Sequence, residues 1–244
     1  MIAQIRAELL KIRTTRTTIA LLLGMLALIL LFTLLDSLLS HPSGLMGKEN
    51  QRELLNVDSI AGVFAALTGV LLVTSEYRHG TIRPTILFNP IRSQVLTAKI
   101  VAGALAGAAF GILGEAIGWA ISYAVLDARG IAIVLNSGDI LLLAFGGLVS
   151  IVIWGAIGAA LGTIIHSQVG AVITLLAWGF VIDTLLFGLV PSVGRYMPPR
   201  ASDALAGLKT QHLLTPASGA IILIAWAIAL ALVGIGLASR RDIN

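Results

Sequence analysis

The sequence predicts an all-α membrane protein with six transmembrane helices, an amphipathic N-terminal interface helix and a short cytoplasmic helix between the second and third spans. Its 244 residues are 57% hydrophobic and only 11% charged, whereas about a quarter of the residues in a soluble domain are charged. Runs of about 20 apolar residues, long enough to cross a bilayer as a helix, recur along the chain. Basic residues gather in the polar breaks between these runs, a pattern typical of membrane topology signals.

Each apolar run is expected to be helical, because backbone groups that face lipid must be hydrogen-bonded within their own segment. The predicted spans are residues 18–39, 57–75, 98–126, 139–165, 169–190 and 217–238. The third is longer than one crossing requires, so we expect it to tilt or to project from the membrane. No soluble segment of domain size separates the spans, so residues 1–244 are interpreted as a single transmembrane domain.

Residues 1–17 precede the first span and have an apolar face. Ile2, Ile5, Leu9 and Ile12 recur at helical spacing, while Arg6, Lys11 and Arg13 lie off that face. This pattern predicts a helix lying in the membrane interface; the alternative is a basic topology signal without further structure. The first span is expected to be an uncleaved anchor, because it is longer than a signal peptide and no cleavage site follows it.

The distribution of lysine and arginine orients the chain with both termini in the cytoplasm of a cell whose plasma membrane it spans. With the N-terminus inside, ten basic residues fall on the cytoplasmic side and six on the outer side. An excess of basic residues on the cytoplasmic side is the general rule for membrane proteins. The net charge of +4 is therefore explained by topology, and we expect no nucleic-acid partner.

The segment between the second and third spans, residues 76–97, contains helix signals that a simple connector does not need. Gly80 is expected to end the second span, since glycine adopts the left-handed conformation found after helices. Thr81 is expected to cap a helix over residues 81–88, with Pro84 tolerated in its first turn and Pro90 ending it. The prediction is a short surface helix with apolar anchors between basic flanks.

These residues resemble the cytoplasmic loop of ABC-2 type ABC transporter permeases. The pattern consists of Glu76-Tyr77-Arg78, Gly80-Thr81-Ile82, Leu87, Pro90, Arg92 and Lys99. The resemblance also covers the basic N-terminus, the six spans, the long last outer loop and the closing sequence SRRDI. It implies a non-catalytic permease subunit, bacterial in type, that works as a dimer with a second permease copy and with a dimer of separate ATPase subunits. It implies export, with ATP and magnesium bound by the ATPase and no cofactor bound by this chain.

The resemblance also implies roles for individual residues. Coupling to the ATPase falls on Glu76, Arg78, Gly80, Thr81, Arg83, Pro84, Pro90 and Arg92, with further contacts from Glu8, Lys11 and Arg13 of the N-terminal helix. Arg78 and Arg83 have an alternative role as ligands of anionic lipid headgroups. The two roles are compatible.

Two acidic residues fall inside predicted spans and are candidates for a substrate path. Glu115 lies in the third span and Asp183 in the fifth, and a carboxylate there must face protein, water or a polar partner. Each either lines the path of the cargo or serves as a structural acid between helices, and for Asp183 we favour the structural role. Asp36, Asp58 and Asp139 are expected at the outer ends of their spans, within reach of water.

Other features of the sequence indicate helix packing and short outer structure. Glycines recur in the third and fourth spans, including Gly103, Gly107 and Gly155, and predict close helix packing, within one chain or between two. Asn136-Ser-Gly-Asp139 predicts a turn in which Ser137 or Asp139 caps the fourth span. The proline-rich outer loop, residues 191–216, is expected to include a short helix.

Several kinds of chemistry lack a signature in the sequence. It contains no phosphate-binding loop of the GxxxxGK[ST] type, no HExxH and no cysteine, and its four histidines are scattered, so we expect no metal site. A membrane-embedded enzyme acting on lipid or peptide is the alternative function, and a structural or sensor subunit is a third. For the transporter, the apolar composition favours a hydrophobic or amphipathic cargo such as a drug, peptide or lipid.

Overall fold

The structure, a computed structural model, describes residues 1–89 and 91–240, and within them it is all-α. Over these residues, six helical segments are long and apolar enough to cross a membrane. The predicted all-α class and the predicted number of helical segments able to span a membrane are therefore confirmed. The orientation relative to the cytoplasm remains a prediction from charge.

The six segments begin and end within a few residues of the predicted bounds, except the second and third, which are longer. In chain order they are α2 (Arg16–Leu39), Lys48–Arg78, α7 (Arg92–Ala128), α8 (Ser137–Ile164), Gln168–Leu189 and α13, whose membrane-spanning part is Pro216–Ala238. The second consists of α4 (Lys48–Leu55) and α5 (Asp58–Arg78). The fifth consists of α9 (Gln168–Leu176), a π-helix η1 (Ala177–Ile182) and α10 (Asp183–Leu189).

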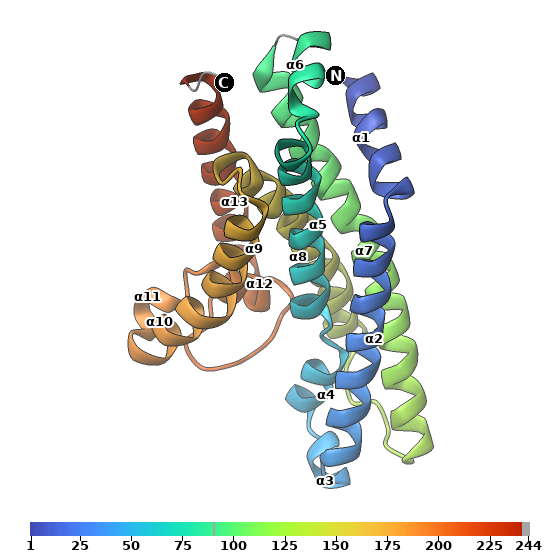
Figure 1. The fold of residues 1–244 in the computed structure, drawn as a ribbon. Helices are drawn as coiled ribbons and strands as arrows, with labels where there is room; N and C mark the ends of the chain where they lie inside the picture. Colours follow the sequence, from blue (N-terminus) through green and yellow to red (C-terminus); the bar gives the residue numbers. More distant parts are fainter. Residues whose placement is uncertain (90, 241–244) are drawn as a thin grey trace.

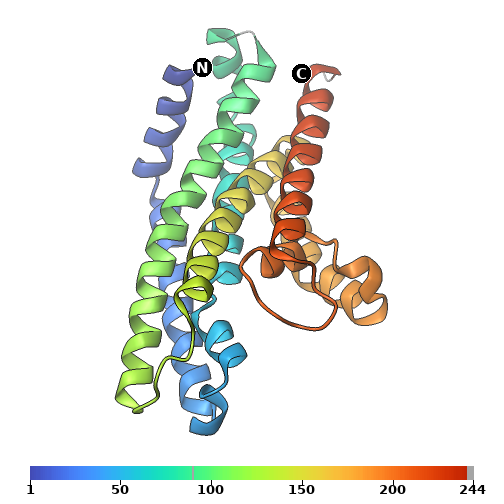
Figure 2. The same cartoon turned by 180° about the vertical axis from the view of Figure 1, so that it is seen from behind.

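Short helices occupy the ends of the molecule and the last loop. They are α1 (Ile2–Thr14), α3 (Pro42–Leu45), α6 (Ile82–Phe88), α11 (Pro191–Gly194) and α12 (Pro198–Leu205), and α13 itself extends to Arg240. The helix expected in the loop before the last span is α12. An N-terminal helix is present as α1, but it runs along α7 in both views (Figures 1 and 2). Its predicted place in the membrane interface is untested.

Helices α5 and α8 lie at the centre, with α2 and α7 on one side and α9, α10 and α13 on the other (Figures 1 and 2). We call the end that holds α1, α6 and the last turns of α13 the terminal end. The opposite end, with α3, α4 and the connection from α7 to α8, is the distal end. The charge-based orientation predicts that the terminal end faces the cytoplasm.

Glycines bring the central helices into backbone contact. A Cβ atom added at Gly158 of α8 would overlap the backbone of Ala66 in α5, and one added at Gly103 of α7 would lie 2.6 Å from the carbonyl oxygen of Gly155 in α8. The small-residue pattern of the third and fourth spans is therefore used within one chain, as the first of the two alternatives predicted. Large apolar side chains remain exposed on the outward faces of α2 and α13, which suits contact with lipid.

The start of α8 differs in detail from the expectation. Its N-cap is Asn136, whose Oδ1 accepts a hydrogen bond from the backbone N–H of Asp139 at 2.8 Å, while the Asp139 carboxylate accepts from the N–H of Asn136. This reciprocal capping box satisfies two amide groups at once, which neither Ser137 nor Asp139 does as a single cap. The helix consequently begins at Ser137.

Candidate functional site

The junction between α5 and α6 is built by one glycine. Gly80 has a φ of +68°, which places it in the left-handed region, and the N–H of Thr81 donates to the carbonyl oxygen of Glu76 at 2.9 Å. The N–H of Gly80 donates to the carbonyl of Tyr77 at 3.3 Å. Together these bonds form a Schellman motif, which ends a helix and fixes the direction of the chain that follows. Gly80 therefore sets the direction in which α6 leaves the bundle.

Helix α6 presents an apolar tip to its surroundings. Ile82 is buried at its start, whereas Leu87 and Phe88 are 84% and 93% exposed. Pro84 lies in the first turn, as expected. Thr81 occupies the N-cap position but makes no capping hydrogen bond with its side chain, so its predicted capping role is wrong. Its backbone is already helical because it continues directly from the Gly80 turn, and this conformation turns the hydroxyl away from the first amides.

Four charged side chains at the terminal end form a cluster that we call the charged cluster: Glu8, Lys11, Glu76 and Lys99. The Nζ atom of Lys99 lies 3.0 Å from Glu8 Oε1 and 2.7 Å from Glu76 Oε1. The Nζ atom of Lys11 lies 3.1 Å and 2.6 Å from the same two oxygens. Lys99 is completely buried and Glu8 is 1% exposed. Two ammonium groups thus balance two carboxylates and tie α1, α5 and α7 together.

The position of Lys11 at the edge of this cluster affects its titration. Burial by itself would lower the pKa of Lys11, but the hydrogen bond and charge of Glu76 and the charge of Glu8 outweigh it, so the pKa is raised above 10.5. Lys11 is therefore positively charged at physiological pH and holds α1 against the end of α5. Its side chain is 46% exposed.

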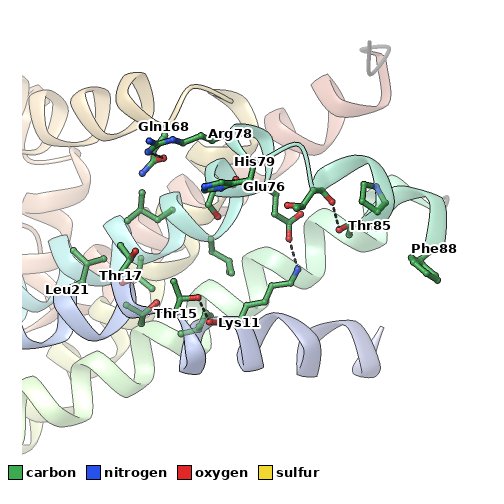
Figure 3. Close-up of a pocket in the computed structure, with 18 residues that line it drawn as sticks. Lys11, Thr15, Thr17, Leu21, Glu76, Arg78, His79, Thr85, Phe88 and Gln168 are labelled. Carbon is green, nitrogen blue, oxygen red and sulfur yellow. Dashed lines mark hydrogen bonds and ion pairs between the residues drawn. The ribbon is translucent and has the colours of Figure 1, made fainter.

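A groove of about 780 Å³ opens between the α1–α2 junction and the α5–α6 junction (Figure 3). Its rim carries Lys11, Arg78 and His79, and Leu21 lies deeper along α2. Several hydroxyl groups also line it, from Thr15, Thr17, Thr18, Thr68, Ser75, Thr81 and Thr85. On one side Arg78 reaches across to α9, where its Nη1 donates to Gln168 Oε1 at 3.0 Å. The groove combines a basic, hydroxyl-rich rim with an apolar wall.

The other residues expected to contact the ATPase lie around α6 and α1. Arg13 and Arg83 are exposed. The Nη1 of Arg92, at the start of α7, donates to the carbonyl of Ala238 in α13 at 3.2 Å. Pro90 lies outside the described residues. The structure thus gathers Arg78, Arg83 and the α6 tip at the terminal end.

Glu8 and Glu76, to which the resemblance assigns a part in ATPase coupling, are buried within this chain. Their carboxylates point inward and pair with Lys99, because a fully buried ammonium group requires anionic partners. They therefore hold the terminal end together, and Glu76 also lines the groove beside α6. Lys99, named above only as the last residue of the pattern that resembles ABC-2 permeases, is the centre of this arrangement. No local pattern in the sequence signals its burial.

The acids of the distal half also form a group, although the sequence separates them widely. Asp58 is 1% exposed, so the expectation that water reaches it is wrong. Its Oδ2 accepts a hydrogen bond from Ser202 of α12 at 3.1 Å, because α12 folds back over the start of α5. Glu115 is half-buried and faces Asp58 across Gly147 of α8.

The second substrate-path candidate, Asp183, is paired. It is 1% exposed, and its Oδ2 lies 2.9 Å from Arg200 Nη2 of α12. Arg200 also lies 3.3 Å from Asp203. The structure therefore brings Asp183 into an ion-pair network that sequence analysis did not anticipate, because Arg200 and Asp203 are in the outer loop. At the distal end Asp139 is likewise paired, with Arg52 and with Lys48.

A scan against models of protein families and a search of curated proteins found no match. Among residues 1–89 and 91–240, no group of three or more His, Cys, Asp or Glu side chains is arranged to hold a metal ion.

Proposed function

We propose that this chain is the membrane-spanning subunit of an ATP-driven exporter of the ABC-2 type. In this proposal a separate ATPase dimer, with its own bound ATP and magnesium, docks on the terminal end. A second permease copy completes the path, and the complex moves a hydrophobic or amphipathic cargo across the cell membrane. This chain supplies the path and the docking surface and hydrolyses nothing by itself.

The observation that carries the proposal is the exposed apolar tip of α6. Leu87 and Phe88 project from the end of a short helix, 84% and 93% exposed, next to the exposed Arg83. Large apolar side chains flanked by cationic groups favour burial in a protein groove, with charge steering the encounter. A connector between two spans has no need of such a tip.

The base of α6 is suited to transmit force. The Schellman motif at Gly80 links α6 to α5 without a flexible segment, and the charged cluster ties α5 to α1 and α7. A displacement of α6 by a partner would therefore move three helices together. Because α5 lies at the centre of the bundle and packs along α8, the displacement would reach the membrane-spanning core.

The groove beside α6 supports the proposed class of cargo. Its rim offers Lys11, Arg78 and hydroxyl groups, and its deeper wall offers leucine side chains of α2 and α5. A molecule with a polar head and an apolar body can contact both at once.

The test is co-expression with candidate ABC ATPase subunits, followed by co-purification and by ATPase and transport assays in proteoliposomes. The double substitution Leu87→Asp with Phe88→Asp should abolish co-purification, because charged groups cannot enter an apolar groove without large desolvation. The matched control is Met46→Asp, which changes another exposed apolar residue, 58% exposed, at the distal end. It should leave docking intact. Docking and transport at the parental level by the α6 variant would refute the proposal.

The alternative, a membrane-embedded enzyme acting on lipid or peptide, makes a different prediction for the purified chain. It requires turnover without any partner. We expect the purified chain alone to hydrolyse neither ATP nor lipid nor peptide. Turnover by the chain alone would favour the enzyme.

A further inference from the structure

A second cavity, of about 80 Å³, lies away from the terminal end, between α5, α8, η1 and α12. Its walls include Trp154, Leu175 and Phe180. Its polar groups are Ser59, Ser202 and Asp203. The cavity is about half the size of an engineered cavity of about 150 Å³ that admits benzene, and it is partly open. A small group of a larger molecule therefore fits, with the remainder extending outward.

Acidic side chains outnumber basic ones around this cavity, and Asp203 lines it. Asp203, Asp58 and Asp183 are the acids, and Arg200 is the basic residue that pairs with two of them, at 2.9 Å from Asp183 and 3.3 Å from Asp203. Asp58, on the far side of Ser202, is close enough for its charge to act on Asp203. Three acidic side chains are thus accompanied by one guanidinium group, which pairs with Asp183 and Asp203 only, in largely apolar surroundings where an unbalanced charge is unfavourable.

One buried oxygen of this group lacks a partner. Asp58 is 1% exposed, and its Oδ2 accepts a hydrogen bond from Ser202, which itself lines the cavity. Its Oδ1 makes no hydrogen bond with any residue that the structure describes. Asp58 lies behind Ser202 and does not itself line the cavity, so it contributes through its charge, which acts on Asp203.

The backbone at the mouth of the cavity is also unusual. Residues Ala177–Ile182 form the π-helix η1, and both Gly179 and Phe180 line the cavity. π-helical turns are rare and frequently occur at functional sites. A Cβ atom added at Gly179 would meet nothing within 4 Å, so this wall leaves space.

We infer that this cavity binds an alkylammonium group. Its N–H groups donate to the Asp203 carboxylate and to the hydroxyl of Ser59, and its carbon atoms pack against Trp154 and Phe180. The positive charge compensates the excess of carboxylates, and an aromatic wall favours a cation over a neutral group. Binding of an alkylammonium group in this cavity does not depend on ATP-driven transport. The further step, that the cavity holds the cargo, rests on the proposed function and narrows the cargo to amphipathic amines.

The titration of Asp203 gives the site a characteristic pH dependence. Burial, followed by the charge of Asp58, raises the pKa of Asp203, with Asp183 adding to the rise and Arg200 opposing it, and the result is about 7. Protonation of Asp203 removes the charge that attracts an ammonium group. Binding should therefore be strong above the pKa and lost as the pH falls through it.

The experiment measures binding of n-butylammonium to the purified chain in a neutral detergent, without ATPase, by saturation-transfer NMR. The neutral control ligand is 1-butanol. We expect butylammonium to bind at least tenfold more tightly than 1-butanol at one pH unit above the pKa of Asp203. One unit below the pKa, its apparent affinity should fall by about tenfold, in proportion to the ionised fraction.

Variants locate the site. Asp203→Asn should remove the preference for the cation, whereas Asp203→Glu should retain it. The matched control Asp127→Asn removes an exposed acid and should change nothing. If the parent protein binds butylammonium and 1-butanol equally tightly, the inference is wrong, and this result does not depend on whether Asp203→Asn folds. If Asp203→Asn folds and binds the cation as tightly as the parent does, the inference is also wrong. Neither result affects docking through α6, so the two proposals fail separately.

Discussion

At the scale of single residues, the charged cluster depends on the pairing of buried charges. Lys99 is completely buried and depends on Glu8 and Glu76 for compensation. Removing one partner of a buried ion pair is strongly destabilising, because the remaining charge is left without compensation. Substitutions in the charged cluster therefore test whether α1, α5 and α7 are joined as described.

We expect Lys99→Met to lower the free energy of unfolding by about 3–5 kcal/mol, since two buried carboxylates would share only Lys11. Thermal unfolding of the detergent-solubilised protein measures the change. Lys209→Met, at an exposed lysine, is the control. Adding Glu8→Gln to Lys99→Met should restore part of the lost stability, because one uncompensated carboxylate is removed. If the double variant is instead less stable than Lys99→Met by the full effect of a second independent substitution, the described pairing is wrong.

The raised pKa of Lys11 predicts an effect of alkaline pH. A lysine whose pKa is higher in the folded state contributes stability that is fully present below its unfolded value of 10.5 and is lost as the pH rises through the folded value. The difference in stability between the parent and Lys11→Met should therefore be constant below pH 10.5 and shrink above it. Because Lys11 is about half exposed, we expect a difference of at most about 1 kcal/mol. Unfolding temperatures of both proteins across this range provide the measurement.

Gly80 supplies a residue-scale test of coupling. Its φ of +68° is unfavourable for a β-branched residue, while nothing lies within 4 Å of an added Cβ, so the effect of substitution is on the backbone alone. We expect Gly80→Val to leave a complex that hydrolyses ATP without transport, and Gly80→Asn, which tolerates this φ, to retain transport.

The control for this substitution is Gly130→Val at the distal end. Gly130 has a φ of +66° and equally open surroundings, and its neighbour Ile131 donates to Leu126 in the same type of turn. If both valine variants transport equally well, the α5–α6 junction has no special role in coupling.

At the scale of elements, helices α5, α7 and α8 depend on backbone contact. The added Cβ of Gly158→Ala would overlap Ala66 in α5, whereas Gly188, in α10, has nothing within 4 Å. We therefore expect Gly158→Ala to destabilise the protein by about 1–3 kcal/mol, as overpacking does, and Gly188→Ala to change it little. Unfolding temperatures and the yield of monodisperse protein compare the two. Equal stability of the variants would contradict the described approach of α5 and α8.

At the scale of the whole molecule, the structure fixes which segments share an end. Residues of α1, α6 and the last turns of α13 lie together, opposite α3 and α4 (Figures 1 and 2). The sequence contains ten basic residues on the side assigned to the cytoplasm and six on the other. The orientation of the bundle is therefore a single choice that labelling can decide.

The cysteine-free sequence suits this test. With a membrane-impermeant thiol reagent, Ala3→Cys and Arg83→Cys should react only after the cells are permeabilised. Met46→Cys and Gln211→Cys should react in intact cells. Labelling of Arg83→Cys from outside would reverse the orientation and remove the cytoplasmic docking surface from the proposed function.

The sequence by itself determined the class of the fold and the approximate limits of its spans. This information is local: a run of about 20 apolar residues must be helical in a bilayer, whatever surrounds it. The turn at Gly80 was also predictable, because the need for a left-handed residue after a helix is a property of a few adjacent residues. The α7–α8 contact followed from small residues at helical spacing.

The tertiary structure alone decided which charges meet. Glu8 and Lys99 are 91 positions apart, and Asp58 and Ser202 are 144 apart; no local pattern links either pair. The hydropathy pattern predicted that Asp58 lies at the end of a span within reach of water, but α12 folds over Asp58 and buries it. The free energy of a charged group depends on the partners and solvent that folding brings to it, so the pairing of Lys99 and the cavity at Asp203 emerge only in three dimensions.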